Sequence, residues 1–161
     1  MTYGRGYQGA VTLSDGSALV LGGSWSGGNG VKDAEIWTEE LGWTVRSGIG
    51  KEVLWNAQDD IYETQAGSYR LDNHAWLWAA PNGKVFHAGP GETMHWIDVN
   101  DVNDAGEIVG SFTEAIVQNQ TTGQRGNDIY AMNGTTVMFD VGKVLKFGGS
   151  STHESNSPAS N

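Results

Sequence analysis

The chain of 161 residues contains no cysteine. This absence excludes disulfide bonds, thiolate metal ligands and a cysteine nucleophile from within the chain. No apolar run approaches the roughly 20 residues that a membrane-spanning helix needs. The opening residues 1–6 are polar and glycine-rich, unlike a signal peptide. We therefore expect no membrane span and no export signal within these residues.

Basic residues and proline are scarce as well. Lys and Arg together number 9 against 19 Asp and Glu, which gives a net charge of −10. A nucleic acid would be repelled at long range by such a chain. There are 3 prolines but 24 glycines, a balance that suits many tight turns and argues against a disordered proline-rich tail. The composition leaves the oligomeric state open.

One pattern occurs three times along the chain: an apolar strand, a tight turn, a second apolar strand and a glycine-rich exit. The three copies span residues 9–23, 75–91 and 135–149. Their predicted turns are Asp15-Gly16, Asn82-Gly83 and Val141-Gly142. The first two turns combine residue types that tolerate positive φ, as two-residue hairpins require. A hairpin that recurs with the same ending indicates a repeat architecture.

Further strands are predicted after the first two exits. The candidates are Ala34–Thr38, Trp43–Arg46, Met94–Val99 and Glu107–Val109, with a possible helical turn in 51–57. One unit then has four short strands, which is typical of a blade of a kelch-type β-propeller.

We therefore predict an all-β fold, a fragment of a kelch-type β-propeller with about three four-stranded antiparallel blades. The approximate blades are 1–68, 69–128 and an incomplete 129–161. A closed ring needs at least about four blades, so the chain is expected to build only part of one.

Two aromatic residues near the first hairpin are candidate site residues. Tyr7 lies where the hairpin begins, a position where tyrosine is most often a half-buried packing residue. Trp25 lies between glycines on a loop, where its ring can cover a ligand or a sugar face or can simply close one end of the blade.

A second candidate cluster precedes the second hairpin, in residues 69–76. Arg70 can hydrogen-bond vicinal hydroxyls while an aromatic ring such as that of Tyr69 stacks on a sugar face. A structural role is equally open to Arg70. For Asp72, Asn73 and His74 we expect a structural role, with His74 buried and satisfied.

No metal site can be read from the histidine or acidic residues. His87 and His95 alternate with apolar residues and are expected to be strand side chains rather than ligands. The acidic stretch 98–107 fails the spacing of a calcium-binding loop in both registers considered. Counted from Asp98, Val102 holds the fifth position and Asn103 the turn-glycine position; counted from Asp101, Ala105 holds the fifth position and Phe112 that of the bidentate glutamate. It is expected to be a solvated turn.

Taken together, these residues resemble the copper radical oxidases, specifically the galactose oxidase family. The matching stretches run in family order over most of the chain: 5–8, 13–16, 21–28, 69–77, 87–90, 94–96, 131–134, 137–140 and 147–150. A generic kelch protein would share only the glycine pairs.

The resemblance implies an extracellular enzyme with a copper site at the propeller axis. Such an enzyme oxidises a primary alcohol, of a sugar or a related compound, to an aldehyde and reduces O2 to H2O2. Tyr7 would ligate copper and belong to a cysteinyl-tyrosine radical cofactor, and Trp25 would stack over it. Arg70 would hydrogen-bond substrate hydroxyls, with Tyr69 lining the site nearby. In this picture the Tyr7 phenol lies beneath the Trp25 indole.

Four partners that the family uses are absent from this chain: the cross-linked cysteine, the second ligand tyrosine and both ligand histidines. We therefore expect the isolated chain to be inactive. The alternatives are a non-catalytic kelch propeller that binds a protein or a glycan, and a truncated product without function. A cysteine close to Tyr7 and a downstream Tyr-His pair in flanking sequence would favour the oxidase.

Overall fold

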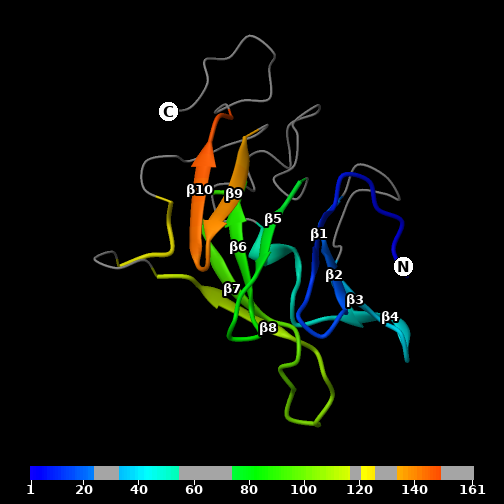
Figure 1. Ribbon diagram of the computed structural model, residues 1–161. Coiled ribbons are helices and arrows are strands. Elements are labelled where there is room, and N and C mark those ends of the chain that lie inside the picture. Colours follow the sequence, from blue (N-terminus) through cyan, green and yellow to red (C-terminus); the bar gives the residue numbers. More distant parts are fainter. Residues whose placement is uncertain (24–32, 55–73, 117–120, 126–133, 150–161) are drawn as a thin grey trace, which may run out of the picture.

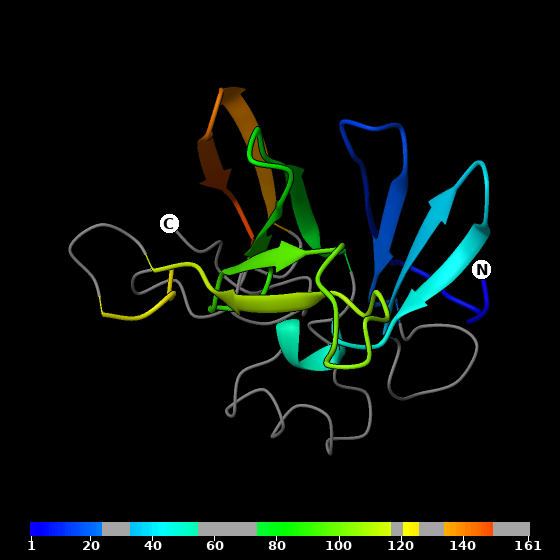
Figure 2. The same cartoon turned by 90° about the horizontal axis from the view of Figure 1, so that it is seen from below.

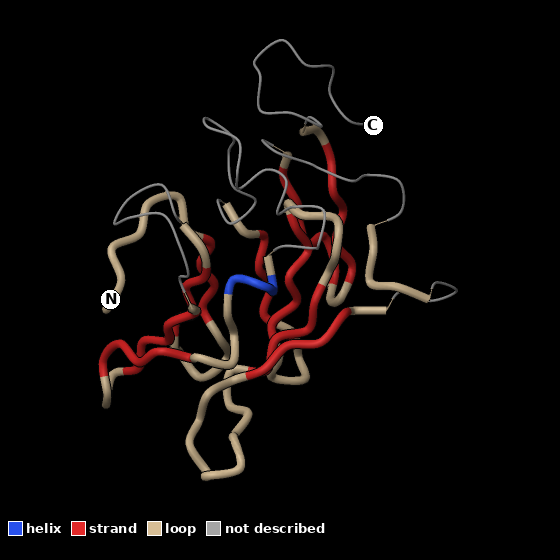
Figure 3. The backbone as a smooth tube through the Cα atoms, turned by 180° about the vertical axis from the view of Figure 1, so that it is seen from behind, coloured by secondary structure: helices blue, strands red, loops and turns tan. Residues whose placement is uncertain are grey.

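The computed structural model describes residues 1–23, 33–54, 74–116, 121–125 and 134–149 (Figure 1). Within these ranges the chain forms ten strands in three antiparallel sheets and one short 3-10 helix, η1 (Lys51–Val53). Figure 3 shows η1 as the one blue segment among red strands. It lies within the helical turn predicted for 51–57, of which residues 55–57 fall outside the described ranges.

The first sheet has four strands in sequence order: β1 (Gly9–Thr12), β2 (Ala18–Leu21), β3 (Ala34–Thr38) and β4 (Gly42–Arg46). In β1 the side chains alternate between exposed and more buried positions, as expected for a strand with one covered face. The turn before β2 is fixed by Asp15, whose Oδ1 accepts hydrogen bonds from the backbone N–H of Ser17 at 2.9 Å and from its hydroxyl at 2.6 Å.

The second sheet repeats this arrangement, and the third contains two strands. The second consists of β5 (Trp76–Ala79), β6 (Val85–Gly89), β7 (His95–Asp98) and β8 (Ser111–Glu114). The third consists of β9 (Thr135–Asp140) and β10 (Lys143–Phe147). The exits of the first and third hairpins begin with glycine pairs, Gly22-Gly23 and Gly148-Gly149, all at positive φ. Glycine adopts this conformation without the steric cost that a Cβ brings.

The first strands of successive sheets lie next to one another. β1 contacts β5, and β5 contacts β9. In Figure 2 the orange β9–β10 hairpin lies beside the green β5–β6 strands, with the blue strands of the first sheet on the other side. Four-stranded antiparallel sheets set side by side in chain order fit part of a β-propeller. The all-β prediction is confirmed, while the blade boundaries stay a prediction.

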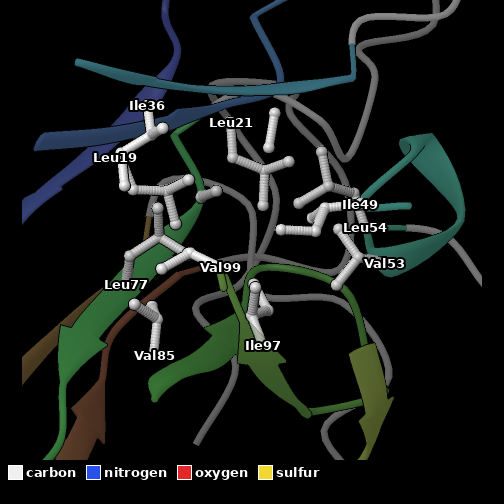
Figure 4. Close-up of a cluster of buried hydrophobic side chains, with 12 residues drawn as sticks. Leu19, Leu21, Ile36, Ile49, Val53, Leu54, Leu77, Val85, Ile97 and Val99 are labelled. Carbon is white, nitrogen blue, oxygen red and sulfur yellow. The ribbon is translucent and has the colours of Figure 1, made fainter. Parts of the chain in front are cut away.

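An apolar core fills the space between the first two sheets (Figure 4). Its side chains come from both sheets and from the η1 segment. The labelled members are Leu19, Leu21, Ile36, Ile49, Val53, Leu54, Leu77, Val85, Ile97 and Val99. Arg46 adds a polar contact between the two sheets, because its Nε donates to the carbonyl of Val99 at 2.8 Å. Burial of this cluster joins the two sheets into one body.

The two-stranded third sheet is apolar on both faces. Met138 and Val144 point toward the second sheet, where Trp78 Nε1 also donates to Thr136 Oγ1 at 3.1 Å. Val137, Phe139, Leu145 and Phe147 are exposed. A sheet with apolar side chains on both faces is typical of one that packs between two neighbours, which again fits part of a ring.

The fourth strand of the second sheet was predicted in the wrong place. The expected strand Glu107–Val109 is a loop, and β8 lies four residues later. Asn103 explains the difference, because its Oδ1 accepts hydrogen bonds from the N–H groups of Ala105 and Glu107, each at 3.0 Å. This turn folds the segment back on itself and leaves Ile108 exposed.

Within the described ranges, no helix has the length and apolar character needed to cross a bilayer.

Gly9 permits the close approach of the first two sheets. A Cβ at this position would lie 2.5 Å from the carbonyl oxygen of Ala75 and 2.7 Å from its Cβ. We expect Gly9→Ala to lower the free energy of unfolding by about 2 kcal/mol, because backbone must shift to relieve the clash.

Gly16→Ala provides the comparison for this prediction. Gly16 has positive φ but open space around it, so its substitution should cost only about 1 kcal/mol. Urea denaturation measures both values. If both substitutions lowered the free energy of unfolding equally, the contact between Gly9 and Ala75 would not be tight.

Candidate functional site

Tyr7 lies where the first two sheets begin. It precedes β1, and its backbone carbonyl accepts a hydrogen bond from the N–H of His74 at 2.6 Å. The two rings meet edge to face, with centroids 5.1 Å apart. Tyr7 is 52% exposed, and it lies where the first two sheets begin.

Both residues of this contact have an unusual backbone. Tyr7 has φ 66° and His74 has φ 56°, the two non-glycine residues with positive φ in the described ranges. This conformation costs about 1–3 kcal/mol per residue and is concentrated at functional sites, where the surrounding structure holds it in place. The two positive φ angles therefore mark this contact as a candidate functional site.

A buried ion pair fixes the segment before Tyr7. Arg5 Nε lies 3.1 Å from Glu35 Oε2, and both side chains are fully buried. The guanidinium also donates to the carbonyl of Gly22 at 2.8 Å and to that of Asp33. Burial alone would raise the pKa of Glu35, but hydrogen bonds from Thr2, Arg5 and Tyr3 outweigh burial and hold that pKa below its usual range. Glu35 is therefore an anion that Arg5 and the N-terminal backbone neutralise.

Two buried histidines face each other farther along the second sheet. His87 on β6 and His95 on β7 are register partners, and their Nδ1 atoms are 3.3 Å apart. Burial lowers the pKa of His87 to about 3, with the neighbouring His95 and Arg125 acting in the same direction. Burial also lowers the pKa of His95 to about 4, although Glu114 opposes it. Both rings are therefore neutral at pH 7.

Comparison with known proteins places the chain beside the galactose oxidases. The whole chain aligns with a galactose oxidase from Gibberella zeae at 35% identity over 167 residues. A second galactose oxidase sequence of the same species matches equally well. The chain spans 22% of each relative, about a fifth of its length. No protein-family model matches.

A solved structure agrees with these relatives. It is described as a novel fungal alcohol oxidase with catalytic diversity among the AA5 family, in complex with copper. The match has a TM-score of 0.71 and 36% identity, and covers 92% of this chain and 27% of that one. Along its whole length the chain is therefore similar to galactose oxidases, of which it spans about a fifth.

The structure describes only one of the four site residues that this family resemblance predicts. Tyr7 lies at the beginning of the first hairpin, as expected. Trp25, Tyr69 and Arg70 lie outside the described ranges, as do Asp72 and Asn73. The stacking of Trp25 on Tyr7 therefore stays a prediction.

The prediction for His74 was wrong. It was expected to be buried, but it is exposed and its ring lies against Tyr7. His74 has a left-handed backbone and comes two residues before β5 begins, so it lies outside the strand. His87 and His95 are strand side chains, as predicted, but their pairing across two strands was missed.

The described residues do not complete a copper site of the galactose oxidase type. Among them, no group of three or more His, Asp or Glu side chains could hold a metal ion, and the sequence has no cysteine. Tyr7 is the one predicted ligand that they contain. Its phenol oxygen is one possible member of such a donor set, and the other donors would have to lie outside the described residues.

Proposed function

We propose that this chain forms part of a copper-dependent alcohol oxidase. The reaction converts a primary alcohol, of a sugar or a related compound, to an aldehyde. The two electrons and two protons removed from the alcohol reduce O2 to H2O2. The identity to galactose oxidase along the whole chain and the likeness to a copper-bound alcohol oxidase support this proposal. An extracellular location is part of it.

The position of Tyr7 is the observation that carries the proposal. The residue is 52% exposed, and its backbone is tied to the beginning of the second sheet through His74. As a phenolate, Tyr7 would hold Cu(II) through its oxygen, and copper when bound supplies one-electron redox chemistry. A fixed backbone at Tyr7 supports this role, because a metal ligand must be held in place.

The remaining roles follow the family assignment. Trp25 would cover the Tyr7 ring and exclude water from it. Arg70 would bind and orient substrate hydroxyls through its fork of N–H donors, and Tyr69 would line the same region. A cysteine linked to Tyr7, a second tyrosine and two histidines would have to come from outside these 161 residues.

The test compares this chain with the complete protein encoded by the gene that contains this sequence. Copper content and peroxide release are measured for both, with galactose and with small primary alcohols as substrates. We expect one copper per complete protein and alcohol-dependent peroxide, with neither for the 161-residue chain alone. A complete protein without copper and without turnover would favour the non-catalytic propeller. Turnover by the short chain would contradict the assignment of the missing ligands.

A further inference from the structure

We infer that Arg5, held by Glu35, is a positioning residue for Tyr7. This inference rests on the proposed function, which gives Tyr7 its role as a copper ligand. The sequence did not predict the pairing of Arg5 with Glu35, because the two residues stand 30 positions apart and charged side chains are expected at the surface.

One guanidinium joins three separate parts of the first sheet. Arg5 reaches the side chain of Glu35 on β3, the carbonyl of Gly22 at the exit of β2, and the carbonyl of Asp33 just before β3. Gly22 and Asp33 flank the connection between β2 and β3. The planar fork of an arginine can serve all three acceptors at once, whereas a lysine ammonium acts as a single point.

Glu35 also binds the backbone on the N-terminal side of Arg5. Its carboxylate accepts hydrogen bonds from the backbone N–H groups of Thr2 and Tyr3. The chain from Thr2 to Arg5 is therefore tied to β3 at both of its ends. Arg5 also lies over the Tyr3 ring, 5.4 Å from its centroid.

Two backbone hydrogen bonds transmit this anchoring to Tyr7. The N–H of Gly6 donates to the carbonyl of Gly23 at 3.2 Å, next to the glycine that Arg5 holds. The carbonyl of Tyr7 then accepts from the N–H of His74. Tyr7 has a strained left-handed backbone, and such a residue keeps its conformation only when both flanks are fixed.

Stability alone does not explain a fully buried pair of charges. Removing two charges from water is costly, and an apolar pair of similar volume is often as stable. The second sheet uses a comparable arrangement. There Arg125 donates to the carbonyls of Ala88, Pro90 and Gly91 at the exit of β6. In both sheets a guanidinium fixes the backbone where the second strand ends.

The test compares Arg5→Lys with Arg46→Lys in the 161-residue chain. Arg46 is also buried, and it bonds to Val99, Thr44 and Val45. Amide hydrogen exchange is followed at Gly6 and His74, with the strands β2 and β6 as the reference for global opening. Chains labelled with 3-fluorotyrosine give a 19F resonance for Tyr7, which is assigned by its loss in Tyr7→Phe.

We expect Arg5→Lys to speed exchange at Gly6 and His74 at least about tenfold beyond its effect on β2 and β6, which reports local rather than global opening. The Tyr7 19F resonance should shift. Arg46→Lys should change the exchange rates at Gly6, His74, β2 and β6 by the same factor. It should leave the Tyr7 19F resonance at its native position. Glu35→Gln, which keeps the side-chain size, should reproduce the pattern of Arg5→Lys with a smaller amplitude.

The inference would be overturned if Arg5→Lys and Glu35→Gln sped amide exchange equally at all these positions and left the Tyr7 19F resonance unshifted. Arg5 would then be a purely structural residue. If Arg5→Lys does not fold, Glu35→Gln alone decides between the two outcomes. Because no copper is present in these measurements, a negative result would leave the proposed oxidase function untouched. If the oxidase proposal failed instead, the exchange rates and the 19F shift measured here would be unaffected.

Discussion

Acidification from pH 7 to pH 5 is expected to lower the free energy of unfolding by about 4 kcal/mol, because two buried imidazoles bind protons only in the unfolded chain. His87 and His95 have pKa values of about 3 and about 4 in the folded protein, against 6.5 when unfolded. At pH 5 each unfolded imidazole gains about 2 kcal/mol from protonation. The folded rings stay neutral at that pH.

The direction of this effect follows from the lowered pKa values. The stability that neutral His87 and His95 contribute is fully present above pH 6.5 and is lost progressively as the pH falls toward 4 and then 3. Two nearby charges modify the effect in opposite senses. Arg125 disfavours protonation of His87, and Glu114 favours protonation of His95.

The matched control replaces both histidines by asparagine. The amide of asparagine can occupy the Nδ1 position of each ring and keep a hydrogen bond, but it does not titrate in this range. Urea denaturation between pH 7.5 and pH 4.5 should show a steep fall in the free energy of unfolding for the native chain. The fall should be much smaller for His87→Asn/His95→Asn. Equal slopes would show that the acid sensitivity comes from other groups.

Tyr7→Phe is expected to reduce alcohol-dependent peroxide release by the complete protein at least about a thousandfold, or about 4 kcal/mol in activation free energy. The substitution removes one oxygen atom and keeps the ring against His74. Groups that act as one unit in a reaction lose most of their effect when any member is removed. The measurement is kcat with saturating substrate and excess copper.

Tyr3→Phe is the control for this substitution. Tyr3 lies four residues earlier, and its ring contacts the Arg5 guanidinium, a contact that phenylalanine preserves. We expect nearly full activity from Tyr3→Phe. If Tyr7→Phe kept more than about a tenth of the native kcat, a loss of only about 1.4 kcal/mol in activation free energy, the phenol would not be a ligand.

Much of the fold follows from local patterns in the sequence. The Asp15-Gly16 and Asn82-Gly83 turns fix two hairpins because each turn determines its own geometry. The Glu107–Val109 strand failed because alternation alone does not reveal the Asn103 side chain that closes a turn there. A side chain that hydrogen-bonds nearby backbone competes directly with strand pairing.

The site was predicted less completely than the fold, since its geometry depends on contacts distant in sequence. Tyr7 was found through family resemblance, but the edge-to-face contact with His74 joins residues 67 positions apart and has no local signal. The His87–His95 pair could have been found from strand register, since the two residues are equidistant from Gly91 in the hairpin between them. The Arg5–Glu35 pair has no such signal.

The central claim is that the Tyr7 phenol is the copper ligand that this chain contributes. Crystals of the complete, copper-loaded protein allow the metal to be located by anomalous scattering at the copper edge. The account predicts a copper peak in direct contact with Tyr7 Oη. A copper peak coordinated by other residues, with Tyr7 Oη out of bonding distance, would contradict it.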